Sequence, residues 1–288
     1  MRDRHFYGST HLLHATRMVT TALLFILWAL PVQAQVSISP TSIFLQDRAP
    51  FANVIVSNGS SDAQEVSIRF DFGYSVSDEG GNVSMSYPDE ENEQDLTDHL
   101  NAFPRNFILE PGQRQTIRIA VRGLNQEEDG TYWSRVRILA SPMAPPLEAM
   151  ADQQTVSARI NINFEQVIPV SFRKGNVTTG VTLHEIDFQQ EGPENGHFLI
   201  HMEREGNSPF VGSVTTRIRD ARGRQVLEQM SNISLYYELN RRFPVDLAEL
   251  PAGDYEVTVL VRSDRRDISS GNLIQVEPIQ RIQSFRVE

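Results

Sequence analysis

The sequence predicts an all-β protein built from two β-sandwich domains that follow an export signal. Short segments such as Val66–Phe70 and Thr116–Val121 alternate apolar and polar residues, which places one face of a strand on a core and the other in water. Turn-forming pairs such as Asn58-Gly59 and Pro111-Gly112 separate these segments. No amphipathic helix follows the N-terminal apolar run, so antiparallel sandwiches are the expected architecture.

The N-terminal residues have the features of a cleaved signal peptide. Arg2, Arg4 and Arg17 precede an apolar run over Val19–Leu30. The run is followed by small side chains, up to Ala34, at the positions that a signal peptidase recognises. A membrane anchor is the alternative interpretation, but a bilayer span needs about twenty apolar residues and this run is shorter. We therefore expect residues 1–34 to be a signal peptide that is removed on export.

Composition excludes several classes of function. The chain has 288 residues and a net charge of −11, so nucleic acid and anionic membrane surfaces are poor partners. It has no cysteine, which rules out disulfides, zinc–thiolate sites and thiol nucleophiles. Each domain must therefore be held together by its hydrophobic core alone.

The strand pattern divides the mature chain into two domains. We expect a first immunoglobulin-like domain over residues 35–173 and a second β-sandwich over residues 174–288. The predicted strands of the first are 36–45, 51–58, 64–74, 105–109, 114–121, 131–140 and 154–172. Those of the second are 182–189, 197–204, 211–219, 224–231, 241–246, 253–262 and 272–287. Two insertions, Asp78–Leu100 and Ser141–Asp152, are expected to be mobile, exposed loops.

Six segments of the first domain together resemble a known family. They are Ile38–Leu45, Ala52–Asn58, Phe103–Gly112, Gln115–Ile119, Glu128–Trp133 and Ile168–Arg173. In this order and spacing they resemble the periplasmic chaperones of pilus and fimbrial assembly, the PapD-like family, as a divergent member. The resemblance covers most of residues 36–174 and little of the second domain.

The resemblance implies a function based on strand donation. In that family, the last strand of the first domain completes the unfinished sandwich of a fibre subunit, with main-chain hydrogen bonds and alternate side chains supplying the contact. The residues expected to bind the partner are Val156, Ala158, Ile160, Ile162 and Phe164, which share one face. The alternative is an ordinary last strand whose apolar side faces its own core.

One family feature is missing. The resemblance implies a basic pair that holds the carboxyl terminus of the subunit, but the matching positions are Ser42 and about Val167. A carboxylate clamp needs a fixed cation, so this part of the mechanism is not carried over. Arg48, Arg173 and Lys174 are the candidates for a substitute.

No pattern for catalysis, a cofactor or a metal is present. His197 and His201 are four residues apart, which on a strand separates them by about 13 Å, too far to share one metal. The acidic stretch Asp89–Asp95 lacks the glycine and oxygen spacing of a calcium loop. No phosphate-binding glycine loop and no Gly-x-Ser-x-Gly elbow occurs. We therefore expect no enzyme activity, no catalytic residue and no cofactor.

The expected function is that of a periplasmic chaperone for an exported pilin-like or surface subunit, with an outer-membrane usher as the second partner that the resemblance implies. We expect no binding to nucleic acid and no membrane insertion after the signal is removed. Two alternatives remain at this stage. One is a structural or adhesive cell-surface protein without chaperone activity. The other is a carbohydrate-active or proteolytic enzyme.

Overall fold

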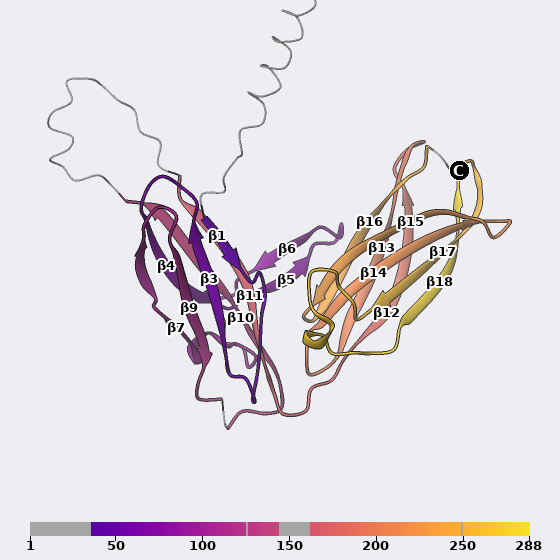
Figure 1. The fold of residues 1–288 in the computed structure, drawn as a ribbon. Helices are drawn as coiled ribbons and strands as arrows, with labels where there is room; N and C mark the ends of the chain where they lie inside the picture. The colour runs from indigo at the N-terminus through magenta and orange to yellow at the C-terminus, as the bar shows by residue number, and fades with distance from the viewer. Residues whose placement is uncertain (1–35, 125, 144–161, 249) are drawn as a thin grey trace, which may run out of the picture.

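The computed structural model describes residues 36–124, 126–143, 162–248 and 250–288. Its strands form two separate β-sandwiches joined by the short segment 175–178, and Figure 1 shows them meeting at one end and diverging like the arms of a V. The predicted all-β class with two sandwich domains is confirmed. The predicted signal peptide lies outside the described residues, and no helix within them is long and apolar enough to cross a membrane.

The first sandwich packs two sheets face to face. One sheet has the order β1-β3-β9-β7 and the other the order β2-β11-β10-β4-β8. The strands are β1 (Val36–Ser39), β2 (Ile43–Gln46), β3 (Phe51–Asn58), β4 (Gln64–Asp71), β7 (Leu100–Phe103), β8 (Asn106–Leu109), β9 (Arg114–Val121), β10 (Gly130–Pro142) and β11 (Phe164–Lys174). Alternation decides which side chains are buried. On β3, Val54 and Val56 are fully buried, whereas Ile55 between them is 43% exposed.

The predicted first strand, 36–45, is split into two. β1 pairs antiparallel with β3, whereas β2 crosses to the other sheet and pairs in parallel with β11. Pro40 lies between them, and a proline has no N–H to continue a ladder. The break lets one short stretch of chain join both sheets.

The prediction of a mobile loop over Asp78–Leu100 is wrong. The stretch contains the turn and second strand of the hairpin formed by β5 (Tyr74–Ser77) and β6 (Val83–Ser86), followed by a 3-10 turn (Thr97–His99) that leads into β7. Leu96 and Leu100 belong to the first-domain core, so apolar anchors override the acidic composition. Of the second insertion, Ser141 and Pro142 extend β10, and its residues from 144 onward lie outside the described part.

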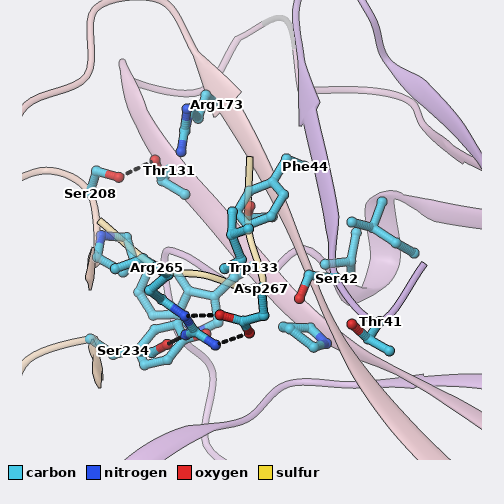
Figure 2. Close-up of a pocket in the computed structure, with 18 residues that line it drawn as sticks. Thr41, Ser42, Phe44, Thr131, Trp133, Arg173, Ser208, Ser234, Arg265 and Asp267 are labelled. Atoms are coloured by element: carbon cyan, nitrogen blue, oxygen red, sulfur yellow. Dashed lines mark hydrogen bonds and ion pairs between the residues drawn. The ribbon is translucent and has the colours of Figure 1, made fainter. Parts of the chain in front are cut away.

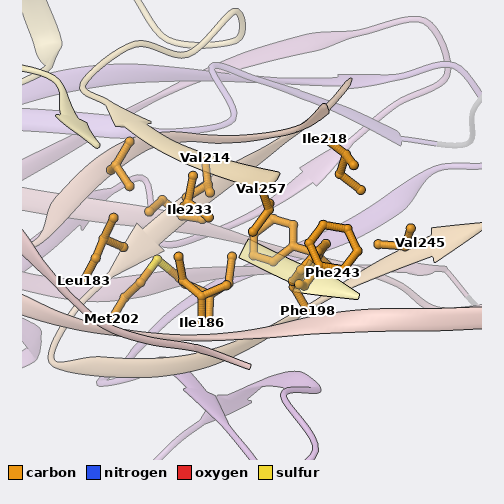
Figure 3. Close-up of a cluster of buried hydrophobic side chains, with 14 of the residues drawn as sticks. Leu183, Ile186, Phe198, Met202, Val214, Ile218, Ile233, Phe243, Val245 and Val257 are labelled. Atoms are coloured by element: carbon orange, nitrogen blue, oxygen red, sulfur yellow. The ribbon is translucent and has the colours of Figure 1, made fainter. Parts of the chain in front are cut away.

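The second sandwich follows the predicted strand order. Its sheets have the orders β12-β13-β16 and β15-β14-β17-β18. The strands are β12 (Thr179–Gln190), β13 (Asn195–Gly206), β14 (Phe210–Asp220), β15 (Gln225–Leu235), β16 (Glu238–Asp246), β17 (Gly253–Arg262) and β18 (Ile279–Val287), with a 3-10 turn at Ser270–Asn272. Figure 3 shows the core between these sheets, where Phe198 and Met202 on β13 are fully buried together with Val257 on β17.

The two sandwiches contact each other through an aromatic cluster. Trp133 of β10 packs against Tyr236 of the second domain, with ring centroids 5.0 Å apart, and against Phe72 at 5.8 Å. Beside the cluster, the Thr131 hydroxyl donates to the Ser208 hydroxyl across the interface at 2.7 Å. A buried apolar cluster with a satisfied polar contact at its margin is typical of a defined domain interface.

Candidate functional site

The outer edge of β11 is open over half of its length. β10 pairs with β11 from Phe164 to Lys174, but β2 covers the other edge only at residues 170–173. Within the described ranges, no strand pairs with the outer edge of β11 from Phe164 to Pro169. This stretch therefore presents unpaired backbone groups, which are a template for pairing with another chain.

The position of Pro169 indicates which backbone groups face outward. Pro169 lies opposite Arg135 of β10 and has no N–H to donate. A proline fits a strand where its nitrogen points away from the neighbouring strand. Because backbone direction alternates along a strand, the N–H and C=O groups of Glu165 and Val167 then point to the same open edge.

The structure places only two of the five residues predicted to bind the partner. Ile162 precedes β11 and is 57% exposed. Phe164 begins β11, lies opposite Ala140 and is half-buried against the first-domain core. Val156, Ala158 and Ile160 lie outside the described residues, so their face is still a prediction.

The position of Phe164 indicates which side of β11 the predicted apolar row shares. By the period of two, it shares its side of β11 with Ile168, Val170 and Phe172, which are buried in the first-domain core. At Phe164, the predicted apolar row coincides with the core-facing side of β11. Ile162, which precedes the strand, is exposed.

A cavity of about 340 Å³ opens between the two domains next to this edge. Figure 2 shows its first-domain wall, which includes Ser42 just before β2, Phe44 of β2, Trp133 of β10 and Arg173 of β11. The second domain supplies Ser234 of β15 and loop residues, which include Ser208, Pro209, Arg265 and Asp267. The strand with the open edge, β11, and the strand that covers the rest of that edge, β2, therefore also line the cleft.

The two arginines of the cleft differ in whether a carboxylate is paired with them. Arg265 forms an ion pair with Asp267 and also donates to the Ser234 hydroxyl at 3.2 Å. The hydrogen bond from Arg265 to Asp267 holds the pKa of the Asp267 carboxyl below its usual range. Arg173 donates to the Asn272 carbonyl and has no ion pair with a carboxylate of the described part of the chain. Burial lowers the pKa of the Arg173 guanidinium, yet an arginine remains a cation at neutral pH.

The structure separates the three proposed substitutes for the missing basic pair. Arg48 is exposed in the turn after β2 and does not line the cleft. Lys174 donates to the Glu127 carbonyl and lies 3.9 Å from Asp129, also outside the cleft lining. Only Arg173 lines the cavity. Ser42 lines it as well, and Val167 is half-buried on β11.

Two cleft features were not predicted from the sequence. The first is Trp133, which is 1% exposed and whose indole nitrogen has no hydrogen-bond partner among the described residues. A buried donor without an acceptor costs about 1–3 kcal/mol, so an acceptor from water or a bound chain would be stabilised there. The second is the Arg265–Asp267 pair, which lies in a loop that carries no periodic signal.

The histidines lie elsewhere. His201 hydrogen-bonds Asn240 at 2.8 Å, and His197 is buried with its Nδ1 3.5 Å from Glu191. No cluster of three or more metal-ligating side chains occurs within the described ranges.

Comparisons with known proteins gave weak matches only. No protein-family model matches the chain, and no curated protein matches it. Among solved structures, the chain is similar to the CsuC–CsuE chaperone–tip adhesion subunit complex of Acinetobacter baumannii, with 12% identity, a TM-score of 0.44, and coverage of 86% of this chain and 98% of the other.

Two further similar structures are also chaperones. They are the Salmonella enterica SafA pilin in complex with the SafB chaperone (15% identity, TM-score 0.43, 88% and 99% coverage) and the E. coli chaperone DraB (14% identity, TM-score 0.42, 88% and 97% coverage). TM-scores below 0.5 do not establish a common fold. The function therefore has to be inferred from the open edge and the cleft of this chain.

Proposed function

We propose that this protein is a periplasmic chaperone that binds an exported pilin-like or surface subunit by strand addition along β11. The single observation that carries the proposal is the outer edge of Phe164–Pro169, with which no strand of the described part of the chain pairs. An extended segment of another chain would pair there through main-chain hydrogen bonds, and alternate side chains would supply specificity. Such binding consumes no ATP and breaks no covalent bond, so we propose no enzyme activity.

The backbone groups on this edge set the register of the added strand. Glu165 and Val167 offer their outward N–H and C=O groups, and Pro169 offers no donor. Pairing would therefore begin near Pro169 and run toward Ile162. In this direction it would reach the predicted row Val156–Phe164, whose apolar side would cover the open core of the subunit.

The cleft would receive the part of the subunit that extends past the edge. It is lined by β2 and β11 and contains one cation, Arg173, that is not paired with a carboxylate in the described part of the chain. Because Ser42 and Val167 are not basic, binding would depend on edge pairing and apolar contact more than on a pair of fixed cations.

The export signal predicted over residues 1–34 supports a periplasmic location. It also supports the choice of client, since subunits of surface fibres pass through the same compartment. An outer-membrane usher is the further partner that the resemblance of residues 36–174 implies. We propose no role for nucleic acid, cofactor or metal.

The proposal is tested by substituting Ile162, the exposed residue of the predicted row. We expect Ile162→Asp to abolish co-purification of the subunit from periplasmic extract, because a carboxylate cannot enter an apolar core without a large desolvation cost. The control is Ile282→Asp on β18, which is 51% exposed in the second domain. It adds the same charge far from the edge and should leave the captured subunit unchanged.

Two results would contradict the proposal. One is equal capture of the subunit by the parent and Ile162→Asp. The other is finding the protein on the outside of intact cells by surface labelling, which would favour the structural or adhesive alternative.

A further inference from the structure

The hairpin β5–β6 connects the two domains. It follows β4 in the first domain, and Figure 1 shows it extending across the space between the arms toward the second sandwich. β5 and β6 pair only with each other, over Tyr74–Ser77 and Val83–Ser86. A two-stranded hairpin is marginally stable on its own, so its conformation depends on what it contacts.

The hairpin is held on the second domain by hydrogen bonds along its length. The Ser75 hydroxyl donates to the Ser234 carbonyl at 2.7 Å. The Asn240 N–H donates to the Ser77 hydroxyl at 2.7 Å. At the tip, the Arg242 N–H donates to the Gly81 carbonyl at 3.1 Å.

Two of these bonds cover a strand edge. Asn240 and Arg242 belong to β16, which pairs with β13 on one side and lies at the end of its sheet. Their N–H groups are two residues apart and point away from β13, where an edge strand normally leaves such donors unpaired. The hairpin satisfies both, so it docks on β16 much as an additional strand would.

The tip fits closely against the second domain. Gly81 has φ = 77°, a conformation that favours glycine. A Cβ at this position would lie 2.5 Å from Leu199 Cδ1 and 2.7 Å from the Arg242 backbone nitrogen. Only a residue without a side chain allows this approach.

The base of the hairpin enters the aromatic cluster between the domains. The Tyr74 ring lies 4.9 Å from Tyr237 and 6.4 Å from Tyr236, centroid to centroid. Asn92, after the hairpin, donates to the Tyr237 hydroxyl at 3.1 Å. The hairpin is thus fixed at its base, along β5 and at its tip.

We propose that the β5–β6 hairpin is an interdomain clamp that holds the two sandwiches at one angle. The clamp is separate from the cleft, because the first-domain wall of the cavity comes from β2, β10, β11 and the residues before β2 and includes no residue of the hairpin. This inference stands on intramolecular contacts and does not depend on the proposed client.

The test is a distance measurement between spin labels in the full chain. The protein has no cysteine, so Thr116→Cys on β9 and Ser284→Cys on β18, both exposed, give one label in each domain. In this background we expect a single narrow interlabel distance. Gly81→Ala should lose the narrow peak, because the added Cβ expels the tip from Leu199 and Arg242.

The matched control is Gly80→Ala, one residue earlier in the same turn. A Cβ there would lie 3.4 Å from the Asp78 carboxylate and touch nothing in the second domain, so the narrow peak should remain. If Gly81→Ala does not fold, the double variant Ser75→Ala/Ser77→Ala removes two interdomain hydrogen bonds without a clash and should broaden the distance. A broad distance in the parent, or an unchanged narrow one in the folded clamp variants, would overturn the proposal.

Discussion

The two sandwiches differ in how they treat the edges of their sheets. In the second domain, side chains and the β5–β6 hairpin cover the ends of the sheet β12-β13-β16. In the first domain, no strand among the residues that the structure describes pairs with the outer edge of β11 over Phe164–Pro169, next to the cleft. The same chain therefore covers some edges and leaves this one available.

The covering of β12 is done by long polar side chains. Arg281 and Gln283 extend from β18 and donate to the carbonyls of Leu183 and Ile186 on β12, at 2.8 Å and 2.5 Å. These bonds sit at the register shift between Leu183 and Ile186. Free carbonyls that would otherwise attract another strand are thus satisfied within the domain.

The contrast between the covered edges of the second domain and the open edge of β11 points to a role for the open edge. An exposed strand edge carries a risk of aggregation, and this molecule has the means to cover one. An edge that is left free, interrupted only by Pro169 and adjoining a cleft, is better explained by pairing with a partner than by chance. Variants on both kinds of edge test this difference between the two domains.

The largest expected effect comes from adding a proline whose nitrogen faces β10. Gln166→Pro places the missing N–H on the side that faces Ile138 of β10, where the two residues are paired. We expect a loss of about 1–3 kcal/mol or more in the free energy of unfolding, because a ladder bond is broken and its acceptor is left buried. Chemical denaturation measures this change.

The matched variant is Val167→Pro, whose missing N–H would face the open edge, as it does at Pro169. It should leave the free energy of unfolding nearly unchanged and weaken binding of the subunit by about a factor of ten, the equivalent of one hydrogen bond. Equal destabilisation by both variants would show that both sides of β11 are paired, and the contrast between the domains would fail.

The second effect comes from uncovering β12. We expect Arg281→Ala/Gln283→Ala to lose about 1–3 kcal/mol of stability and to self-associate as concentration rises, because the two carbonyls of β12 are left without partners. Denaturation and sedimentation velocity measure the two effects. Arg286→Ala on the same strand is the control, since its pair with Asp254 is exposed and should contribute almost nothing. A monomeric double variant of unchanged stability would show that this covering is unnecessary.

Much of the fold could be predicted because alternation is a local signal. Burial of Val54 and Val56 around the exposed Ile55 follows directly from apolar and polar residues in turn. The ordered hairpin and the core position of Leu96 were missed, because a polar, acidic stretch gives no sign of the few contacts that hold it. In the sequence, Gly81 is an ordinary turn glycine, because its close approach to Leu199 depends on where the second domain lies.

The site was harder to predict because it is assembled from distant residues. The apolar row from Val156 to Phe164 stays a prediction, since the structure describes it only at Ile162 and Phe164. That Arg173 lines the cleft while Arg48 and Lys174 do not depends on the angle between the domains. The Arg265–Asp267 pair is contributed by a loop almost a hundred residues later, which no local pattern links to β11.

The smallest expected effect concerns the ion pair between Arg265 and Asp267 in the cleft. The pKa of Asp267 is lowered mainly by its hydrogen bond with Arg265, so this pair contributes stability above the ordinary carboxyl pKa of about 4 and loses it as pH falls further. The Asp267 side chain is 47% exposed, so the contribution should be below about 1 kcal/mol. We expect the unfolding free energies of the parent and Asp267→Asn to differ at pH 7 and to converge below about pH 4, as measured by denaturation across that range.

The control is Asp254→Asn, whose carboxylate is 74% exposed and 3.5 Å from Arg286. This variant should follow the parent throughout the pH range. A constant difference between the parent and Asp267→Asn at every pH would mean that the ion pair does not account for it.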